Sequence, residues 1–407
     1  MASPARPARV LHLSENLPLP FDRRVWMELS ALRDRGHRVS AIAPMGDRWN
    51  RPYEEIDGIA IWRYPPPPPT RGALSYIWEF FYCWIQTARL SVVALARRGF
   101  DVIHSANPPD TFWTIGLFYK LFGKRFVFDH HDLCPELYVA RFGPQVEGNL
   151  LHRMLFLLER AQFRTADLVI STNESYRQVA ITRGRVEPSR VVVVRSGPSR
   201  ERFATVRPVD TSLKRGRAYL VAYLGVMAPQ DGVDHLLRAA HHLVRARGRG
   251  DVAFTLIGSG DSFDDLKALS HQLGLDEHVC FTGRIPDEDV ERILATADVC
   301  VSPDPRNPLN DVSTMNKVLE YMACGRPIVA YDLREHRYSA GDGALYAEPN
   351  REEDLADKIA VLLDDPARRR SMGEYNRRRF LERMAWEYSA GELLRAYERL
   401  CGPKRGA

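Results

Sequence analysis

The stretch Asn310–Ala330 places a polar loop, a helix start and one glutamate close together in the chain. Ser313 or Thr314 can cap this helix, and Gly325 with the following proline ends it. The apolar residues of the helix recur at helical spacing and predict a buried stripe formed by Met315, Val318, Leu319 and Met322.

The opposite face of the same helix carries Asn316, Lys317 and Glu320. The free amide groups of a first helical turn, together with a cation, suit a phosphate, and a carboxylate suits sugar hydroxyls. The segment therefore predicts a nucleotide-sugar site. The alternative is a surface helix on which Lys317 and Glu320 form an i, i+3 ion pair.

A second polar run, Phe128–Glu136, directly follows a predicted strand and is the main acid–base candidate. Ligands bind at the carboxyl ends of strands in open α/β sheets. The histidines and carboxylates of this region could also form a metal site, and they are His104, Asp129, His130, His131 and Asp132. We expect no metal, because the adjacent His130 and His131 tend to point apart. A structural histidine and a polar contact to substrate both remain open.

Three further motifs follow or flank strands of the second half. Gly225–Gly232 follows a strand and opens a helix, as a backbone phosphate cradle does. Gly258–Gly260 has no third glycine at the dinucleotide spacing and predicts a tight turn. The acidic run Asp287–Asp289 lies where a helix begins and is best explained as a cap.

The alternation of apolar strands with amphipathic helices predicts two doubly wound α/β domains. A chain of 407 residues is too long for one compact core. We place the N-terminal domain at 1–207, a polar linker at 208–217 and the C-terminal domain at 218–385. The tail 386–407 contains one last amphipathic helix that must pack on structure already built.

The predicted strands carry the apolar runs of the sequence. In the first half they are Val10–Leu13, Val39–Ala43, Ile59–Tyr64, Val102–Ser105, Phe126–Asp129, Leu168–Ser171 and Val191–Val194. In the second half they are Tyr219–Leu224, Val252–Ile257, Val279–Phe281, Val299–Val301 and Ile328–Ala330.

Charge and cysteine content narrow the class of protein. The net charge of +5 arises from residues 1–210, whereas the rest of the chain has a small acidic excess, which suits an anionic surface or substrate for the first half. The sequence contains no compact basic run with interleaved aromatic residues, so nothing in it indicates nucleic-acid binding. The 6 scattered cysteines form no metal or disulfide pattern, and the apolar run after the basic start is short for a signal peptide, so we expect a cytoplasmic protein.

The aromatic-rich stretch Leu74–Ala96 contains Glu79, Gln86 and Arg89, and each charge would cost about 2.5–3.5 kcal/mol at a bilayer centre. We expect a helix that packs on the sheet. A role at the inner membrane surface, with an anionic membrane as partner, is the alternative to ordinary packing.

Taken together, the motifs resemble family 4 glycosyltransferases along nearly the whole chain. The stretches that carry the resemblance are "RRVWMELSALRDRGHRVSAIAP", "YLGVMAPQDGVDHLLRAA", "LIGSGD", "FTGRIPDED", "ADVCVSPD" and "EYMACGRPIVA". The final helix from Trp386 is similar to one that crosses back to the N-terminal domain in that family.

The resemblance implies a retaining enzyme of the GT-B type, with two facing Rossmann-like domains and transfer in the cleft between them. The donor nucleotide-sugar would bind the C-terminal domain, a glycan or lipid-linked acceptor the N-terminal domain, and no metal or cofactor is expected. Glu320 matches a glutamate on the ribose hydroxyls, Arg284 and Ile285 match residues that line the base, and His131 matches a histidine on the donor sugar.

Three positions depart from the family pattern. Val312 stands where the first signature glutamate is expected, which assigns its sugar contacts to Asn310 or Asp311. Val226 and Asp231 stand where the donor loop usually has an arginine and a lysine. We therefore expect Gly225, Lys317 and the amides of Thr314, Met315 and Asn316 to hold the diphosphate, with Lys317 and His131 as the catalytic residues.

The departures keep two other function classes open. A non-catalytic subunit could keep the two-domain scaffold to bind a partner, and a nucleotide-sugar epimerase shares the architecture. A transferase that serves cell-surface polysaccharide or glycolipid synthesis is the function that we favour.

Overall fold

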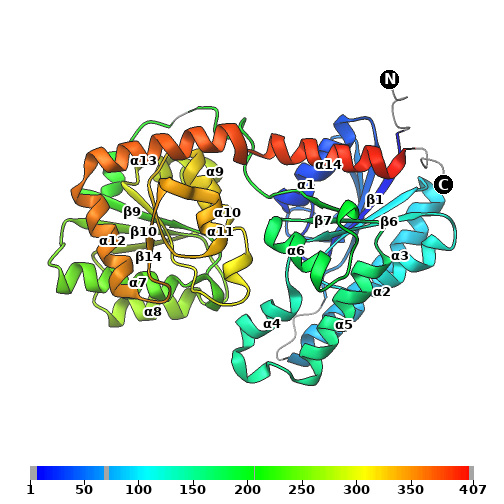
Figure 1. The fold of residues 1–407 in the computed structure, drawn as a ribbon, viewed down its shortest axis with the longest axis horizontal. Coiled ribbons are helices and arrows are strands. Elements are labelled where there is room, and N and C mark those ends of the chain that lie inside the picture. The colour runs from blue at the N-terminus through cyan, green and yellow to red at the C-terminus, as the bar shows by residue number, and fades with distance from the viewer. Residues whose placement is uncertain (1–6, 68–72, 206, 403–407) are drawn as a thin grey trace. The chain divides into compact units, whose positions relative to one another are not determined.

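The chain forms two compact units in a computed structural model that describes residues 7–67, 73–205 and 207–402 (Figure 1). Unit 1 comprises 1–195 and 389–407, and unit 2 comprises 196–388. Both are α/β units built on parallel sheets, as the strand and helix pattern predicts. The arrangement of strands within each unit decides where its ligand-binding edge lies.

Unit 1 is built on an eight-stranded sheet in the order β3-β4-β2-β1-β5-β6-β7-β8. Its strands are β1 (Arg9–Leu13), β2 (Arg38–Pro44), β3 (Tyr53–Ile56), β4 (Ile59–Tyr64), β5 (Val102–Ala106), β6 (Arg125–His130), β7 (Leu168–Ser171) and β8 (Val191–Val193). All neighbours pair in parallel except β3, which is antiparallel to β4. The strand order reverses between β1 and β5.

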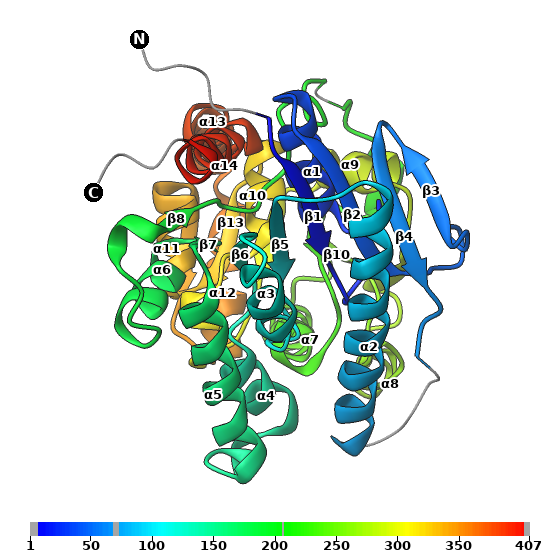
Figure 2. The same cartoon turned by 90° about the vertical axis from the view of Figure 1, so that its right-hand side faces the viewer.

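The helices of unit 1 cover both faces of this sheet. They are α1 (Arg23–Asp34), α2 (Ala73–Arg97), α3 (Trp113–Lys120), α4 (Cys134–Phe142), α5 (Leu150–Thr165), α6 (Glu174–Thr182) and α14 (Trp386–Cys401), with one-turn helices at Pro144–Val146 and Pro188–Arg190. Figure 2 shows α2, α3 and α5 on one face of the sheet, where their apolar side chains meet those of Leu11, Ile103 and Phe126. The other face is covered by α1 and α14.

Unit 2 has a six-stranded parallel sheet in the order β11-β10-β9-β12-β13-β14, which reverses between β9 and β12. Its strands are β9 (Tyr219–Leu224), β10 (Val252–Ile257), β11 (Val279–Gly283), β12 (Val299–Ser302), β13 (Ile328–Tyr331) and β14 (Ala344–Ala347). Its helices are α7 (Val233–His241, extended by a π-helix at His242–Ala246), α8 (Phe263–Gln272), α9 (Asp287–Thr296), α10 (Asn316–Ala323), α11 (Arg334–Ala340), α12 (Glu352–Asp364) and α13 (Pro366–Arg379, extended by a π-helix at Phe380–Met384). Short 3-10 helices lie at Thr211–Lys214, Pro229–Asp231, Asn310–Val312 and Gly341–Gly343.

The division into units falls earlier in the chain than the boundary expected at 207, and the expected linker 208–217 lies inside unit 2. Residues after Arg195 already pack on unit 2, because Phe203 is buried in its core and the carbonyl of Pro198 accepts from the amide of Trp386 at 3.1 Å. The last helix, α14, returns to unit 1 from Ser389 onward. No helix in the described part of the chain is long and apolar enough to cross a membrane.

Three strand ends of unit 2 are tied together by glycines. The amide of Gly225 donates to the carbonyl of Ile257 at 3.0 Å, and the amide of Gly258 donates to the carbonyl of Gly283 at 3.0 Å. A Cβ at Gly258, where φ is +130°, would lie 1.8 Å from the carbonyl oxygen of Gly225. This close approach needs glycine and fixes the loops that follow β9, β10 and β11.

Replacing Gly258 with alanine should therefore destabilise the protein more than a positive φ alone explains. Gly248 is the matched control, because its φ is +65° and a Cβ there would meet nothing within 4 Å. Gly248→Ala should cost about 1 kcal/mol, whereas Gly258→Ala adds a backbone clash and should cost about 3 kcal/mol or more. Urea unfolding of both variants measures the difference, and equal losses would contradict the close approach.

Candidate functional site

The helix that the sequence places at the donor site, α10, begins at Asn316. Its N-cap is Met315 and has no side-chain cap, so the prediction that Ser313 or Thr314 caps it is wrong. Both hydroxyls are engaged elsewhere, since that of Ser313 donates to the Leu309 carbonyl at 2.8 Å and that of Thr314 to Glu335 at 3.4 Å. The N-cap residue Met315 thus offers no side-chain acceptor to the amides at the start of α10.

Lys317 lies inside unit 2, not on an exposed polar face as the helical spacing predicts. Its Nζ donates to Asp304 Oδ1 at 2.7 Å and lies 3.6 Å from Asp231 Oδ1. It also lies 4.9 Å from the ring centroid of Tyr223 and close under Gly225, whose Cβ position would be 3.0 Å from Lys317 Cε. These contacts also replace the ion pair with Glu320 that the surface-helix alternative requires.

Asp304, Lys317 and Asp231, which lie close to Gly225, influence one another's pKa values. Burial alone would raise the pKa of Asp304, but Lys317 and His336 outweigh it and hold that pKa below its usual value. Burial likewise works against the charge of Lys317, yet the two carboxylates raise the pKa of its ammonium group. Burial raises the pKa of Asp231 to about 6, with repulsion from Asp304 opposing the attraction of Lys317.

The other predicted donor residues lie around the same strand ends. Asn310 is buried and its Nδ2 donates to the carbonyls of Gln230 at 2.8 Å and Pro305 at 2.9 Å, so it ties two loops together. Asp311 accepts from the amide of Arg334 at 3.1 Å, at the start of α11. Asn316 is exposed.

Glu320 lies one turn into α10 and is partly buried beside Arg202, whose Nη2 is 3.4 Å from Glu320 Oε2. Arg202 also approaches Glu291 at 3.5 Å and Asp287 at 3.7 Å. Arg284 is exposed directly after β11, and Ile285 packs on the core beside it. The predicted donor residues of unit 2 therefore follow the carboxyl ends of β9 and β12, where the strand order reverses, and of the edge strand β11.

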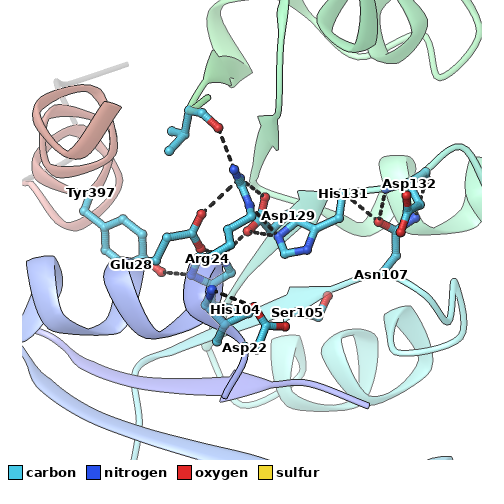
Figure 3. Close-up of polar contacts among 12 residues, drawn as sticks. Asp22, Arg24, Glu28, His104, Ser105, Asn107, Asp129, His131, Asp132 and Tyr397 are labelled. Carbon is cyan, nitrogen blue, oxygen red and sulfur yellow. Dashed lines mark hydrogen bonds and ion pairs between the residues drawn. The ribbon is translucent and has the colours of Figure 1, made fainter. Parts of the chain in front are cut away.

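Unit 1 has a buried polar layer at its own reversal point. His12 of β1 and His104 of β5 are register partners on the face covered by α1 and α14, and Asp129 of β6 lies on the same face. Nδ1 of His104 lies 2.9 Å from the hydroxyl of Tyr397 on α14. Its Nε2 lies 3.5 Å from Asp129 and 3.7 Å from Glu28 of α1 (Figure 3).

Asp129 is the centre of this layer. Arg24 of α1 donates to its Oδ1 at 2.9 Å, and His131 Nε2 lies 2.6 Å from its Oδ2. Burial would raise the pKa of Asp129, but Arg24 and the histidines outweigh it and hold that pKa well below its usual value. The guanidinium group of Arg24 also lies 3.0 Å from Glu28 and donates to the carbonyl of Val194 at 2.9 Å, which fixes it in place (Figure 3).

The turn that carries His131 is held by Asn107. The amides of His131 and Asp132 donate to Asn107 Oδ1 at 2.7 and 3.1 Å, and Asn107 Nδ2 donates to the carbonyl of Asp132 at 2.7 Å. His131 Nε2 also lies 2.8 Å from Arg24 Nε, so a neutral ring can donate to Asp129 or accept from Arg24 but not both. The backbone clamp and these two partners fix the position of the His131 ring.

His130 points away from His131, as expected for adjacent residues. Its ring lies 5.0 Å from that of Phe163 and 5.1 Å from that of Tyr176, and burial lowers its pKa to about 3. Among the described residues, two groups of three have possible ligand atoms within 4.8 Å of one another: His12, Glu28 and His104, and Glu28, Asp129 and His131. Arg24 already supplies a positive charge to both carboxylates of the second group.

Several residues of these clusters were not predicted from the sequence. Arg24, Glu28 and Tyr397 lie on helices whose role in the site depends on long-range packing, and no local pattern marks them. Asp304 had a signal, because it follows β12 directly at the carboxyl edge of the sheet. That position could have marked it as a partner for a nearby cation.

Comparison with known proteins identifies the family. Residues 22–197 match the model described as a glycosyl transferase 4-like domain, and residues 218–365 match the model described as glycosyl transferases group 1. The chain belongs to the family 4-like glycosyltransferases with the GT-B fold, which confirms the resemblance seen in the sequence.

Curated relatives are also glycosyltransferases. The chain is 24% identical over 353 residues to a 2-deoxystreptamine glucosyltransferase of Streptomyces kanamyceticus, which covers 84% of this chain and 88% of that protein. It is 33% identical over 157 residues to an alpha-D-kanosaminyltransferase of the same organism, and this match covers 38% of this chain and 39% of that protein. It is 29% identical over 208 residues to a GDP-mannose-dependent monoacylated alpha-(1-6)-phosphatidylinositol monomannoside mannosyltransferase of Corynebacterium glutamicum. This match covers 49% of this chain and 53% of that protein.

Solved structures share the fold over almost the whole chain. Sucrose-phosphate synthase from Thermosynechococcus elongatus has a TM-score of 0.76 at 19% identity and covers 97% of this chain and 99% of its own. HepE from Anabaena, solved with UDP-glucose, has a TM-score of 0.69 at 15% identity and covers 96% of this chain and 100% of its own.

Replacing Asp129 with asparagine should strongly destabilise unit 1, because it removes one of the two carboxylates beside the buried guanidinium group of Arg24 and leaves that cation with Glu28, whose pKa is raised by burial. We expect a loss of about 3 kcal/mol in the free energy of unfolding, since breaking a buried ion pair leaves a poorly compensated charge inside the protein. The control is Glu398→Gln, which breaks an ion pair with Arg35 whose side chains are 41% and 60% exposed and should cost at most about 1 kcal/mol. Urea unfolding compares the two variants, and similar losses would contradict the central role of Asp129.

Proposed function

We propose that this glycosyltransferase moves a sugar from a nucleotide-sugar to a hydroxyl group of a glycan or lipid-linked acceptor, with retention of configuration and without a metal. The observation that carries the donor assignment is the cluster at the carboxyl edge of unit 2. There the uncapped start of α10, the Gly225 loop and Lys317 lie together at the reversal of strand order. Amide groups and a cation at such an edge suit a diphosphate.

The charges around Lys317 define how the diphosphate would be held. Asp304 and Asp231 offset the charge of Lys317, so the amides of Met315 and Asn316 would provide much of the anion binding. Glu320 would contact the ribose, and Arg202 holds its carboxylate from the other side. This arrangement replaces the two donor-loop cations whose positions are occupied by Val226 and Asp231.

In unit 1, His131 would contact the donor sugar near the reacting carbon. Asp129 and Asn107 hold its ring and its backbone, so the imidazole is positioned before substrate arrives. Preorganised polar groups of this kind stabilise developing charge without moving during the reaction.

Exposed apolar side chains on unit 1 support a lipid-linked acceptor and a membrane surface as partner. They lie on α2, α5 and the end of α3, and they are Trp78, Phe81, Ile85, Leu150, Met154, Leu157, Phe118, Leu121 and Phe122. Leu121 is 79% exposed and Leu150 is 77% exposed. With the basic excess of the first half, such a surface suits the headgroup region of an anionic bilayer at the inner face of the cell membrane. A role in cell-surface polysaccharide or glycolipid synthesis would follow.

A binding subunit without activity is the second candidate. It is favoured by the two carboxylates that already pair with Lys317, because they reduce the charge available to a diphosphate. The two candidates differ in turnover, since only the enzyme releases a glycosylated product and a nucleoside diphosphate.

The first test is a thermal-shift screen of nucleotide-sugars with different bases and sugars. A ligand that binds only the folded protein raises its unfolding temperature, and this identifies the donor without knowledge of the acceptor. The donor found is then incubated with glycan and lipid-linked acceptors, and the product and its anomeric configuration are determined. His131→Ala should lower turnover by about 100-fold or more while the donor affinity stays nearly unchanged. Absence of any nucleotide-sugar binding would rule out the enzyme.

Donor affinity should also depend on pH through Asp231, whose pKa is raised to about 6. Above this pH the carboxylate is ionised and repels the diphosphate, and below it the proton removes that charge. Affinity should rise by about 3- to 10-fold as the pH falls from about 8 to about 5.5, because protonation of Asp231 removes a charge that repels the diphosphate. A nucleotide-sugar itself has no group that titrates in this range, so the change would come from the protein.

Asp231→Asn should bind the donor at pH 8 as tightly as the wild type does at low pH, and its affinity should be nearly independent of pH. The exposed Asp265→Asn on α8 is the matched control and should behave like the wild type. Isothermal titration across the pH range measures the three proteins. An unaltered pH dependence in Asp231→Asn would exclude Asp231 from the donor site.

A further inference from the structure

Unit 2 contains a cavity of about 710 Å³ on the side of the sheet opposite the proposed donor edge. Its lining includes Asp298, directly before β12, and residues 323–327, directly before β13. The donor loops instead follow the carboxyl ends of the strands. Since a four-residue strand such as β12 spans roughly 13 Å, the cavity and the donor edge are separate places.

Arginine side chains dominate the polar lining of this cavity. They come from the segment that enters unit 2, from the loop after α10 and from α13, and they are Arg207, Arg326, Arg369, Arg370, Arg377 and Arg378. Arg370 and Arg378 lie on α13, and both are exposed residues of the lining.

Three of these arginines bind backbone carbonyl groups. Arg377 donates to the carbonyls of Ala323 and Phe203, Arg326 donates to those of Ala297 and Cys324 at 3.2 Å each, and Arg369 donates to those of Leu362 and Leu363. A carbonyl oxygen satisfies a donor but does not neutralise its charge. Burial lowers the pKa of Arg377, as expected for a cation held in this way.

The carboxylates of the lining do not cancel these charges. The described residues of the lining include four carboxylates, Glu291, Asp298, Glu374 and Glu382, against six arginines. Glu291 lies 3.1 Å from Arg207 and 3.5 Å from Arg202, which is not part of the lining, and Asp298 lies 2.8 Å from Lys214. Glu291 therefore compensates one of the six arginines and Asp298 compensates Lys214, which leaves five arginines against Glu374 and Glu382 among the described lining residues.

Much of the remaining lining is apolar, with Phe203, Ala295, Pro327 and Leu381 among its residues. A ligand that fits has an anionic group for the arginines and a compact body for this floor. Guanidinium groups bind phosphate oxygens in pairs of parallel hydrogen bonds, and a phosphate with three free oxygens uses more of them than a carboxylate can. We propose that this cavity binds a phosphate monoester, at a site distinct from the donor edge.

The test uses calorimetric titration of the whole chain with glucose 6-phosphate, with glucose as the uncharged control. The double variant Arg370→Glu with Arg378→Glu changes only exposed side chains and should bind glucose 6-phosphate at least about 10-fold more weakly. The matched control, Arg368→Glu with Arg383→Glu, makes the same change of charge at exposed arginines outside the cavity and should bind it like the wild type. Thermal unfolding verifies that all the proteins are folded.

Donor binding separates this site from the proposed function. Both double variants should bind the nucleotide-sugar like the wild type, and glucose 6-phosphate should bind wild type whether or not that donor is present. The proposal is overturned if wild type shows no saturable binding of glucose 6-phosphate, if both double variants lose it equally, if the cavity variant keeps it, or if the nucleotide-sugar displaces it.

Discussion

The buried charge of Asp129 is the constraint on which the organisation of unit 1 depends. A carboxylate in the core is stable only when a cation and hydrogen-bond donors surround it. Arg24 supplies the cation, and this fixes the position of α1 against the end of β8, whose neighbouring carbonyl at Val194 accepts from the same guanidinium group. His104 extends the network to Tyr397, so the C-terminal helix α14 becomes part of it. His131 then takes its place at the edge of a cluster that is already rigid.

Unit 2 also pairs a buried carboxylate with a cation where its strand order reverses. A carboxylate that follows a central strand, Asp304, pairs with a helical cation, Lys317, beneath the loop at Gly225. In both units the pair lies inside the protein next to the carboxyl edge of the sheet, where parallel strands and helix starts place ligands. The difference is a third charge. Asp231 lies 3.6 Å from Lys317 with a pKa of about 6, so the charge of the donor edge depends on pH.

The sequence predicts the framework well because strands and amphipathic helices follow from hydrophobic spacing, and every strand expected from an apolar run is present. It fails for β3, whose Tyr-Glu-Glu-Ile run is largely exposed at the sheet edge, for the four-residue edge strand β14, and for α13, whose arginine-rich sequence has no apolar stripe. The segment around α10 was found from its helical spacing and the turn of His131 from its position after a strand, and the family resemblance then assigned roles to Glu320 and His131. The burial of Lys317 was missed because a helical wheel assigns every charged residue to the surface, while its partners Asp304 and Asp231 are distant in sequence.

The helix α10 connects the two places in unit 2 where charge is concentrated. Its start lies at the proposed donor edge, and its last residue, Ala323, lines the arginine cavity. A second connection runs through side chains, because Glu320 contacts Arg202, Arg202 contacts Glu291, and Glu291 pairs with Arg207 of the cavity. Glu291 is almost fully buried, so any loss of its pairing with Arg207 must be compensated by Arg202, the same residue that holds the carboxylate of Glu320. Glu320, Arg202, Glu291 and Arg207 therefore form one continuous series of charged contacts between the helix α10 and the cavity.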